Sequence, residues 1–323
     1  MSVRPSKRRD MAVSVNPTEI QERFESVGPE YFWLEVRYSL TRWLLRRFSA
    51  AHARCERRVD LLDLGCGPGN CLRGLPHWIR CFGSDLDLEA LRTARVVSGA
   101  QVFVSDASEI SLKSGSLDFV VMLDVAEHVR EDRKVFSEAS RVLRPGGICI
   151  VTAPAHQLLW GSHDEVVGHF RRYSRRDLVG KLRANGFELL EKRYLLPVTF
   201  FSILGLRLWK RLRKKRTDDF FRLSPAVSSL VTTFLFLEST VSRFFPFFWG
   251  AIVYAVARKP AGEGPTSPAG PDDPFESLAC PRCKSGLRHR RDLPALDCVQ
   301  CSLRYEIVDD IPVMLVERAR AIA

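Results

Sequence analysis

The sequence lacks any uninterrupted apolar run of about 18 residues, the length that a membrane-spanning helix requires, so we expect no such helix. Its basic first 16 residues are not followed by the apolar stretch of about 7 to 15 residues found in secretory signals, so we expect no export signal. The nine cysteines form an odd count in 323 residues, a chain far too long for a disulfide-stapled miniprotein. These absences predict a protein of the reducing cytoplasm.

The composition excludes collagen-like, fibrous and wholly disordered proteins, because 46% of the residues are hydrophobic and 27% are charged. The length has room for two domains of about 150 residues each. Forty-nine Lys and Arg against 38 Asp and Glu give a formal net charge of +11. That excess favours an anionic partner, whether nucleic acid, a membrane surface or a phosphorylated substrate.

Two common nucleotide-binding signatures are also absent. The segment LLDLGCGPGN, residues 61–70, has Asn70 where the dinucleotide fingerprint requires glycine. The chain contains no G-K-[ST] sequence for a P-loop. A nicotinamide or ATP site is therefore disfavoured.

Strands and helices alternate between about Arg58 and Ala155. Strands are predicted at VDLLDL, RCFGSDL, QVFVSD, LDFVVML and GICIVTAP, with helices between them, the first of which follows a glycine-rich turn. Such alternation predicts an α/β fold with a Rossmann-like doubly wound sheet of mostly parallel strands. A further helix, capped by Ser174 and ended by Asn185-Gly186, runs into another strand, and the strand-like WGAIVYAVARK follows.

Shifts in composition divide the chain into five segments. Residues 260–274 hold five Pro and three Gly, which is typical of a linker. We predict a disordered basic N-terminus (1–16), N-terminal helices (17–57), an α/β domain (58–259), this linker, and a small C-terminal domain (275–323). Within the α/β domain, residues from about 195 to 249 are expected to form a helical apolar and basic insertion.

Carboxylates follow the predicted strands at intervals that suit an adenosine ligand. The glycines of GCGPG allow a tight turn and a close approach of the backbone to a polar group. Asp85 ends the next strand, from which its carboxylate can accept both ribose hydroxyls, and Asp106 ends the strand after it. With Asp63, these side chains are expected in one crevice at the carboxyl edge of the sheet, although each alone fits a helix cap or a solvated turn equally well.

In this order, the segments LLDLGCGPGN, GSDLD, VSDAS, LDFVVMLDVAEHV and RVLRPGGICIVTAP resemble the class I S-adenosylmethionine-dependent methyltransferases of type 11. The resemblance implies S-adenosylmethionine as the cofactor and a reversed final strand, for which WGAIVYAVARK is the candidate. It implies these cofactor-binding residues: Asp63, Gly65, Gly67 and Gly69 around the methionine moiety, Asp85 on the ribose, Asp106 and Ala107 near the adenine, Leu123 and Asp124 along the floor, with Cys66 and Leu86 beside them.

Methyl transfer from a sulfonium needs alignment and exclusion of water more than covalent help, but a base assists a hydroxyl or acidic carbon acceptor. Glu127 and His128 follow the fourth predicted strand, and His128 is the first candidate for a catalytic base. The alternative is that His128 packs against the loop or a backbone carbonyl. His156, His163 and His169 are later candidates on the expected acceptor side, and most of them are expected to be structural or exposed.

Two further patterns bear on the acceptor. Asp124, Glu127 and His128 resemble the acidic-acidic-His pattern with which some quinone O-methyltransferases hold a divalent ion, although Asp124 replaces a longer Glu of that pattern. The chain lacks the [DN]-P-P-[YFW] motif typical of methylation on adenine amino groups or glutamine amides. That absence favours an oxygen or a carbon as the acceptor atom.

The stretch from Arg171 to Arg216 holds 15 basic and three acidic residues, a local net charge of +12. Its last ten residues, RLWKRLRKKR, precede the apolar SLVTTFLFLESTVSRFFPFFW, an order that suits monotopic contact with an anionic bilayer. Glu238, Arg243 and Pro246 argue against spanning the bilayer. The alternatives are a helical cap over the active site and an RNA-binding face, for which no module is recognisable.

Four cysteines in the C-terminal segment form two Cys-x-x-Cys pairs, Cys280 with Cys283 and Cys298 with Cys301, separated by 14 residues. Four thiolates at these spacings can close tetrahedrally around a structural Zn²⁺, whereas redox-active pairs are the alternative. The segments CPRCKSGLRHR and DCVQCSLRYEIVDDIPVMLVE resemble the small Trm112-like zinc-binding partners of methyltransferases. That resemblance implies a zinc-ribbon-like partner fused to its enzyme, docked partly by strand pairing, and RNA binding is the competing use of such a ribbon.

We therefore expect a cytoplasmic S-adenosylmethionine-dependent methyltransferase, peripheral at the inner face of the membrane, with a Trm112-like activator in cis. The favoured acceptor is an oxygen or carbon of a lipid-linked or amphipathic small molecule. One alternative is methylation of tRNA, rRNA or a translation protein. Another is a non-catalytic cofactor-binding scaffold.

Overall fold

The computed structural model describes residues 32–49, 58–212, 225–262, 275–290 and 292–322. The basic N-terminus, the first part (17–31) of the expected N-terminal helices and most of the expected linker lie outside these residues. Helix α2 (Phe32–Ser49) lies within the range of the expected N-terminal helices. It buries Val36, Leu40 and Leu44, whose spacing of four residues places them on one face.

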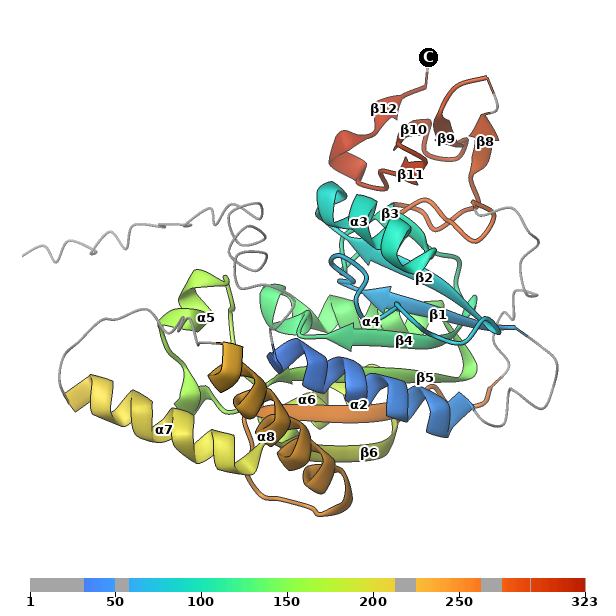
Figure 1. Cartoon of the computed structure of the whole chain (residues 1–323). Coiled ribbons are helices and arrows are strands. Elements are labelled where there is room, and N and C mark those ends of the chain that lie inside the picture. Colours follow the sequence, from blue (N-terminus) through green and yellow to red (C-terminus); the bar gives the residue numbers. More distant parts are fainter. Residues whose placement is uncertain (1–31, 50–57, 213–224, 263–274, 291, 323) are drawn as a thin grey trace, which may run out of the picture.

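A seven-stranded sheet forms the centre of the molecule in the order β3-β2-β1-β4-β5-β7-β6 (Figure 1). Its strands are β1 (Val59–Leu64), β2 (Ile79–Asp85), β3 (Gln101–Val104), β4 (Leu117–Leu123), β5 (Leu143–Pro154), β6 (Glu188–Leu195) and β7 (Ile252–Arg258). Strands β1 to β5 run parallel, and β7 lies between β5 and β6, antiparallel to both. The predicted Rossmann-like sheet and its reversed final strand are both confirmed.

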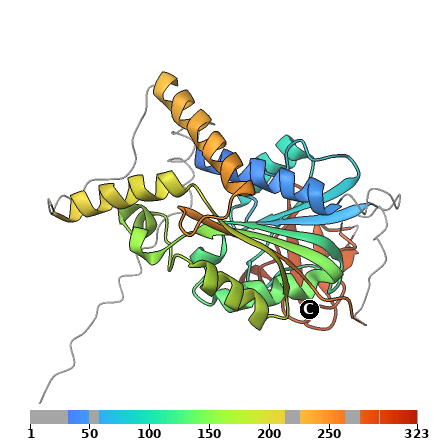
Figure 2. The same cartoon turned by 90° about the horizontal axis from the view of Figure 1, so that it is seen from below.

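Helices cover both faces of this sheet, with α2 and α3 on one side and α4 and α6 on the other (Figure 2). The bounds are α3 (Leu88–Ser98), α4 (Asp132–Val142) and α6 (Arg175–Ala184), and the short helices are η2 (Ala126–His128), η3 (Gln157–Leu159) and α5 (Ser162–Val166). Ser174 caps α6 as predicted, because its hydroxyl accepts the N–H of Asp177 at 3.1 Å. Asp87 caps α3 in the same manner.

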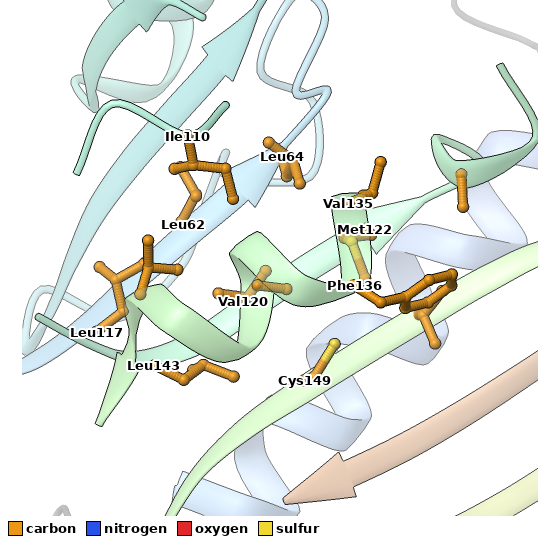
Figure 3. Close-up of a cluster of buried hydrophobic side chains, with 14 of the residues drawn as sticks. Leu62, Leu64, Ile110, Leu117, Val120, Met122, Val135, Phe136, Leu143 and Cys149 are labelled. Carbon is orange, nitrogen blue, oxygen red and sulfur yellow. The ribbon is translucent and has the colours of Figure 1, made fainter. Parts of the chain in front are cut away.

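The alternation of side chains along each strand divides the core into two layers. Leu62 and Leu64 of β1 pack with Val120 and Met122 of β4 beneath α4 (Figure 3). Leu61, between them in the sequence, points to the opposite face and packs under α2 and α3. Both faces of the central strands are therefore apolar, as a parallel sheet requires.

The prediction of a helix directly after the glycine-rich turn is wrong. Residues 65–78 form successive turns instead, in which Leu72 and Arg73 donate their N–H groups to the carbonyl of Gly69. Gly74 adopts a left-handed backbone (φ +74°) and Pro76 follows, so no helix can extend through this short connection. The cofactor loop is consequently held by turns and not by a helix N-terminus.

Helices α7 (Pro197–Leu212) and α8 (Pro225–Phe244) extend away from the sheet on one side of the molecule (Figure 2). The buried carboxylate of Glu238 on α8 holds the start of α7 by accepting the N–H and hydroxyl of Thr199 at 3.1 and 2.6 Å. Arg243 donates to Ser39 of α2 at 2.9 Å. Among the described residues, no helix combines the length and the apolar character needed to cross a bilayer.

A small antiparallel β domain ends the chain, as predicted. Its strands are β8 (Arg288–Arg290), β9 (Ala295–Cys298), β10 (Leu303–Val308), β11 (Ile311–Pro312) and β12 (Arg320–Ala321), with the short helix η4 (Val316–Arg318). Val313 bridges in parallel to Val104 of edge strand β3, and Met314 donates its N–H to the Val104 carbonyl at 2.8 Å. The C-terminal domain thus extends the main sheet, and both apolar layers continue into it.

Candidate active site

The predicted cofactor residues gather at the carboxyl ends of β1, β2 and β4. Asp63 lies in β1 next to Gly83 of β2, and Asp85 ends β2 beside Val104. Asp124 directly follows β4. These strands run parallel, so the three carboxylates share one edge of the sheet.

The turn after β1 requires glycine at two of its predicted positions. Gly65 has φ +73°, and a Cβ there would lie 2.6 Å from a methyl group of Val125. Gly69 has φ +81°, and a Cβ there would lie 2.9 Å from the backbone of Ala94 on α3. The loop is therefore pressed between α3 and the segment after β4, and a larger side chain at either position would push it out of place.

Asp85 holds this loop from the neighbouring strand. Its carboxylate accepts the N–H of Gly67 at 2.9 Å and the N–H of Asp87 at 3.1 Å. Burial raises its pKa despite these hydrogen bonds. A carboxylate has about four acceptor sites, so Asp85 can still accept a hydroxyl group of a ligand.

Asp63 is a strongly perturbed carboxyl group of this edge. Its side chain is buried, and burial together with the neighbouring Asp85 raises its pKa to about 8. A positively charged ligand beside the two acids would favour their ionised forms. This environment suits the methionine end of S-adenosylmethionine, which carries an ammonium and a sulfonium.

Asp106 stabilises a turn, which is the alternative to ligand binding that the sequence left open for this residue. Its Oδ1 accepts the N–H and the hydroxyl of Ser108 at 2.6 and 2.7 Å, which fixes the turn after β3. The turn still lies at the carboxyl edge beside Asp85, whose carbonyl accepts the N–H of Ser105. A role near an adenine stays a prediction for Asp106 and Ala107.

Helix α2 supplies two residues that the sequence reasoning missed. The buried Arg37 forms an ion pair with the partly exposed Asp124, and Thr152 donates its hydroxyl to the same carboxylate at 3.0 Å. The phenol of Tyr38 hydrogen-bonds with the side chain of Asn70 in the glycine loop. The helical spacing of α2 indicated its buried face, but no sequence signal placed that face against the cofactor loop.

The histidine candidates separate into two groups. The rings of His128 and His169 lie 4.6 Å apart, and His163 lies 6.3 Å from His169, all on the segments after β4 and β5. His156 instead stacks on Tyr194 at 4.5 Å and contacts Phe200 of α7. His128, the predicted base, hydrogen-bonds with the backbone of Val167. Although one edge of its ring is exposed, desolvation by the surrounding protein and the nearby ring of His169 lower its pKa to about 4.

The four cysteines of the C-terminal domain converge as the spacing predicted. Their sulfur atoms all lie within 4.8 Å of one another, and Sγ of Cys283 is 3.5 Å from Sγ of Cys298. Tetrahedral Zn²⁺ with bonds of about 2.3 Å needs sulfur atoms about 3.8 Å apart, so this donor set fits zinc. Each pair is followed by a left-handed residue, Lys284 (φ +62°) and Ser302 (φ +51°), which gives two matching knuckles.

Comparisons with known proteins agree with this division of the chain. A family model described as a methyltransferase domain matches residues 62–151. Norajmaline N-methyltransferase of Rauvolfia serpentina is 31% identical over 113 residues, which cover 32% of this chain and 39% of that protein. The chain thus spans about two-fifths of that relative.

The C-terminal domain has relatives of its own. A UPF0434 protein of Nitrosococcus oceani is 56% identical over 46 residues, which cover 14% of this chain and 78% of that protein. The chain is a class I methyltransferase domain fused to a Trm112-like UPF0434 domain. This chain is also similar to a chain in a solved complex between the Haloferax volcanii Trm112 methyltransferase activator and a putative methyltransferase. The match covers 71% of this chain and 98% of that chain, with 20% identity and a TM-score of 0.44.

The matched range of the methyltransferase domain contains every predicted cofactor residue and His128. His163 and His169 lie beyond it, on the segment between β5 and α6. The UPF0434 domain contacts edge strand β3 and also helix α4, where Lys284 pairs with Glu138 at 2.9 Å. Helix α5, which carries His163, lies on the other side of the molecule from the UPF0434 domain (Figure 1).

Proposed function

We propose that this protein transfers a methyl group from S-adenosylmethionine to an oxygen or carbon atom of an amphipathic or lipid-linked small molecule. The observation that carries the cofactor assignment is the shared edge of Asp63, Asp85 and the glycine loop inside a matched methyltransferase domain. Asp63 would face the charged methionine end, and Asp85 would accept ribose hydroxyls. Bound S-adenosylmethionine supplies the activated methyl group.

The acceptor class is argued from the surface of α7, α8 and the turn before β7. Large apolar side chains are exposed along these elements, among them Phe201, Leu230, Phe244, Phe245 and Phe248. Phe248 is 73% exposed and Leu230 is 70% exposed, so these side chains face solvent. An exposed apolar surface of this kind marks an interaction site for a membrane or another apolar partner.

Charge complementarity favours an anionic lipid surface as that partner. Six of the seven residues 210–216, which follow the described surface of α7, are Lys or Arg. Arg207 departs from the expectation for this basic run, because it is buried and packs against Gly161. The same helix reaches the acceptor side, since Phe200 of α7 contacts His156 after β5. A membrane-bound acceptor would therefore enter the active site from the exposed apolar surface of α7 and α8.

Isothermal titration calorimetry with S-adenosylmethionine tests the cofactor assignment. Asp85→Ala should weaken binding by about 1 to 3 kcal/mol, because it removes a charged acceptor of hydrogen bonds. Glu109→Gln, an exposed change close to the same edge, is the matched control and should bind like the wild type. Equal affinity in Asp85→Ala and the wild type would remove Asp85 from the site.

Transfer of tritium from methyl-labelled S-adenosylmethionine into a membrane-containing lysate tests the acceptor. Label in the organic extract supports a lipid-linked acceptor, and label confined to RNA or protein refutes it in favour of the translation machinery. Flotation with anionic liposomes tests the surface, and the double variant Phe245→Ser/Phe248→Ser should lose binding. Val299→Ser, an equally exposed apolar position on the UPF0434 domain, is the control.

A further inference from the structure

The segments after β4 and β5 bring three metal-binding side chains together on the acceptor side. Candidate ligand atoms of Glu127, His128 and His169 all lie within 4.8 Å of one another. The two segments are tied by the N–H of Phe170, which donates to the carbonyl of Glu127 at 2.8 Å. Asp124 is not part of this group, because Arg37 and Thr152 hold its carboxylate elsewhere.

Glu127 provides an independent sign that this group binds a ligand. Its side chain is completely buried, and neither carboxylate oxygen has a hydrogen-bond partner in another described residue. A buried carboxylate without a partner is costly, so it requires a proton or a cation. The nearby guanidinium of Arg172 donates instead to Asp164 at 2.7 Å.

Both histidines are oriented by oxygen atoms behind them. Nδ1 of His169 lies 2.8 Å from Oδ1 of the buried Asp164, which also accepts the N–H of Gly161 at 2.9 Å. The ring of His128 hydrogen-bonds with the backbone of Val167. Each imidazole thus has one nitrogen engaged and one left for a ligand, the arrangement by which outer carboxylates and carbonyls orient metal-binding histidines.

We propose that Glu127, His128 and His169 bind a divalent first-row transition metal ion. Two imidazoles and one carboxylate form a ligand set that such ions prefer, and three protein ligands leave positions open. His128 is exposed at its edge, so those positions can reach an acceptor. Given the proposed function, on which this last step rests, the ion would bind and orient an acceptor oxygen beside the methyl group.

Electron paramagnetic resonance of Mn²⁺ added to the full-length, zinc-loaded protein tests the site without cofactor or acceptor. Mn²⁺ prefers oxygen and nitrogen ligands, so it should not displace zinc from the four thiolates. We expect one Mn²⁺ per chain and imidazole ¹⁴N couplings in the pulsed spectrum. Glu127→Gln should weaken binding at least tenfold, and His169→Gln should remove one ¹⁴N coupling.

Controls separate this site from surface binding and from misfolding. Glu131→Gln changes an exposed acid four residues from Glu127 and should leave Mn²⁺ affinity unchanged. His128→Gln alters an exposed edge, so its weaker binding should come without a change in the circular dichroism spectrum. Absence of bound Mn²⁺ at millimolar concentration, or binding that Glu127→Gln leaves intact, would overturn the metal site. Either result would leave the S-adenosylmethionine titration unaffected, so failure of the metal site and failure of the proposed function are distinguishable.

Discussion

The buried carboxyl group of Asp63 should make the protein less stable as the pH rises, and Asp63→Asn should remove this effect. Burial and Asp85 raise its pKa from the ordinary value of 3.8 to about 8. Between these two values the folded protein holds a proton that the unfolded chain has released. Stability therefore falls as the pH rises through this window, and it is highest at the acidic end.

The magnitude follows from the one proton involved. A difference of one bound proton changes the free energy of unfolding by about 1.4 kcal/mol per pH unit. From pH 5 to pH 7 the wild type should thus lose about 2.7 kcal/mol relative to a variant that cannot ionise at this position. Asparagine has nearly the shape of the protonated acid, so Asp63→Asn should fill the same space.

Urea unfolding of the full chain at pH 5, 6 and 7 measures this difference. The gap between Asp63→Asn and the wild type should widen with pH in favour of the variant, while Glu109→Gln, an exposed change, should follow the wild type. Parallel pH profiles for Asp63→Asn and the wild type would refute the reasoning. Calorimetry supplies a second readout, because binding of the cationic cofactor near pH 7 should release a proton from the wild type only.

Three further predictions concern the fusion and the core. Cys280→Ser should lower the zinc content measured by elemental analysis and the melting temperature of the UPF0434 domain; full zinc occupancy would contradict the four-cysteine site. Arg144→Leu removes the cation between two buried carboxylates of β1 and β4, of which Asp60 keeps Arg80 and Asp118 loses its pair with Arg144, and should cost about 3 to 5 kcal/mol in urea unfolding; an unchanged midpoint would contradict this reasoning. Met314→Pro removes the N–H donated to β3 and should speed hydrogen exchange in β3 and β11, with no change in β6.

Much of the fold could be predicted because its elements depend on local patterns. The strands β1 and β4 coincide with their predicted apolar segments, since a strand buried on both faces reads as a continuous apolar run. Ser174 caps α6 because its side chain reaches a donor only three residues away. The reversed strand β7 followed from the family resemblance, which implies it in sequence order.

The errors come from contacts that no local pattern records. A helix was expected after the glycine loop, but Gly74 and Pro76 leave only turns there. Arg207 belongs to the basic run that we expect at a bilayer surface, yet the absence of a side chain at Gly161 lets its guanidinium pack inside. The Arg37 ion pair with Asp124 spans 87 positions of sequence, and only the packing of α2 on the sheet creates it.

The sequence also did not identify the full set of residues in the candidate metal group. The acidic-acidic-His pattern grouped Asp124, Glu127 and His128 because they are neighbours in the sequence. The backbone of Asp124 is left-handed (φ +57°), and Arg37 holds its carboxylate, whereas the third member of the group with Glu127 and His128 is His169 on the segment after β5. Charge favours histidine at the position of His169. A carboxylate there would repel Glu127, as Asp124 already does, whereas an imidazole offers the metal ion a neutral lone pair.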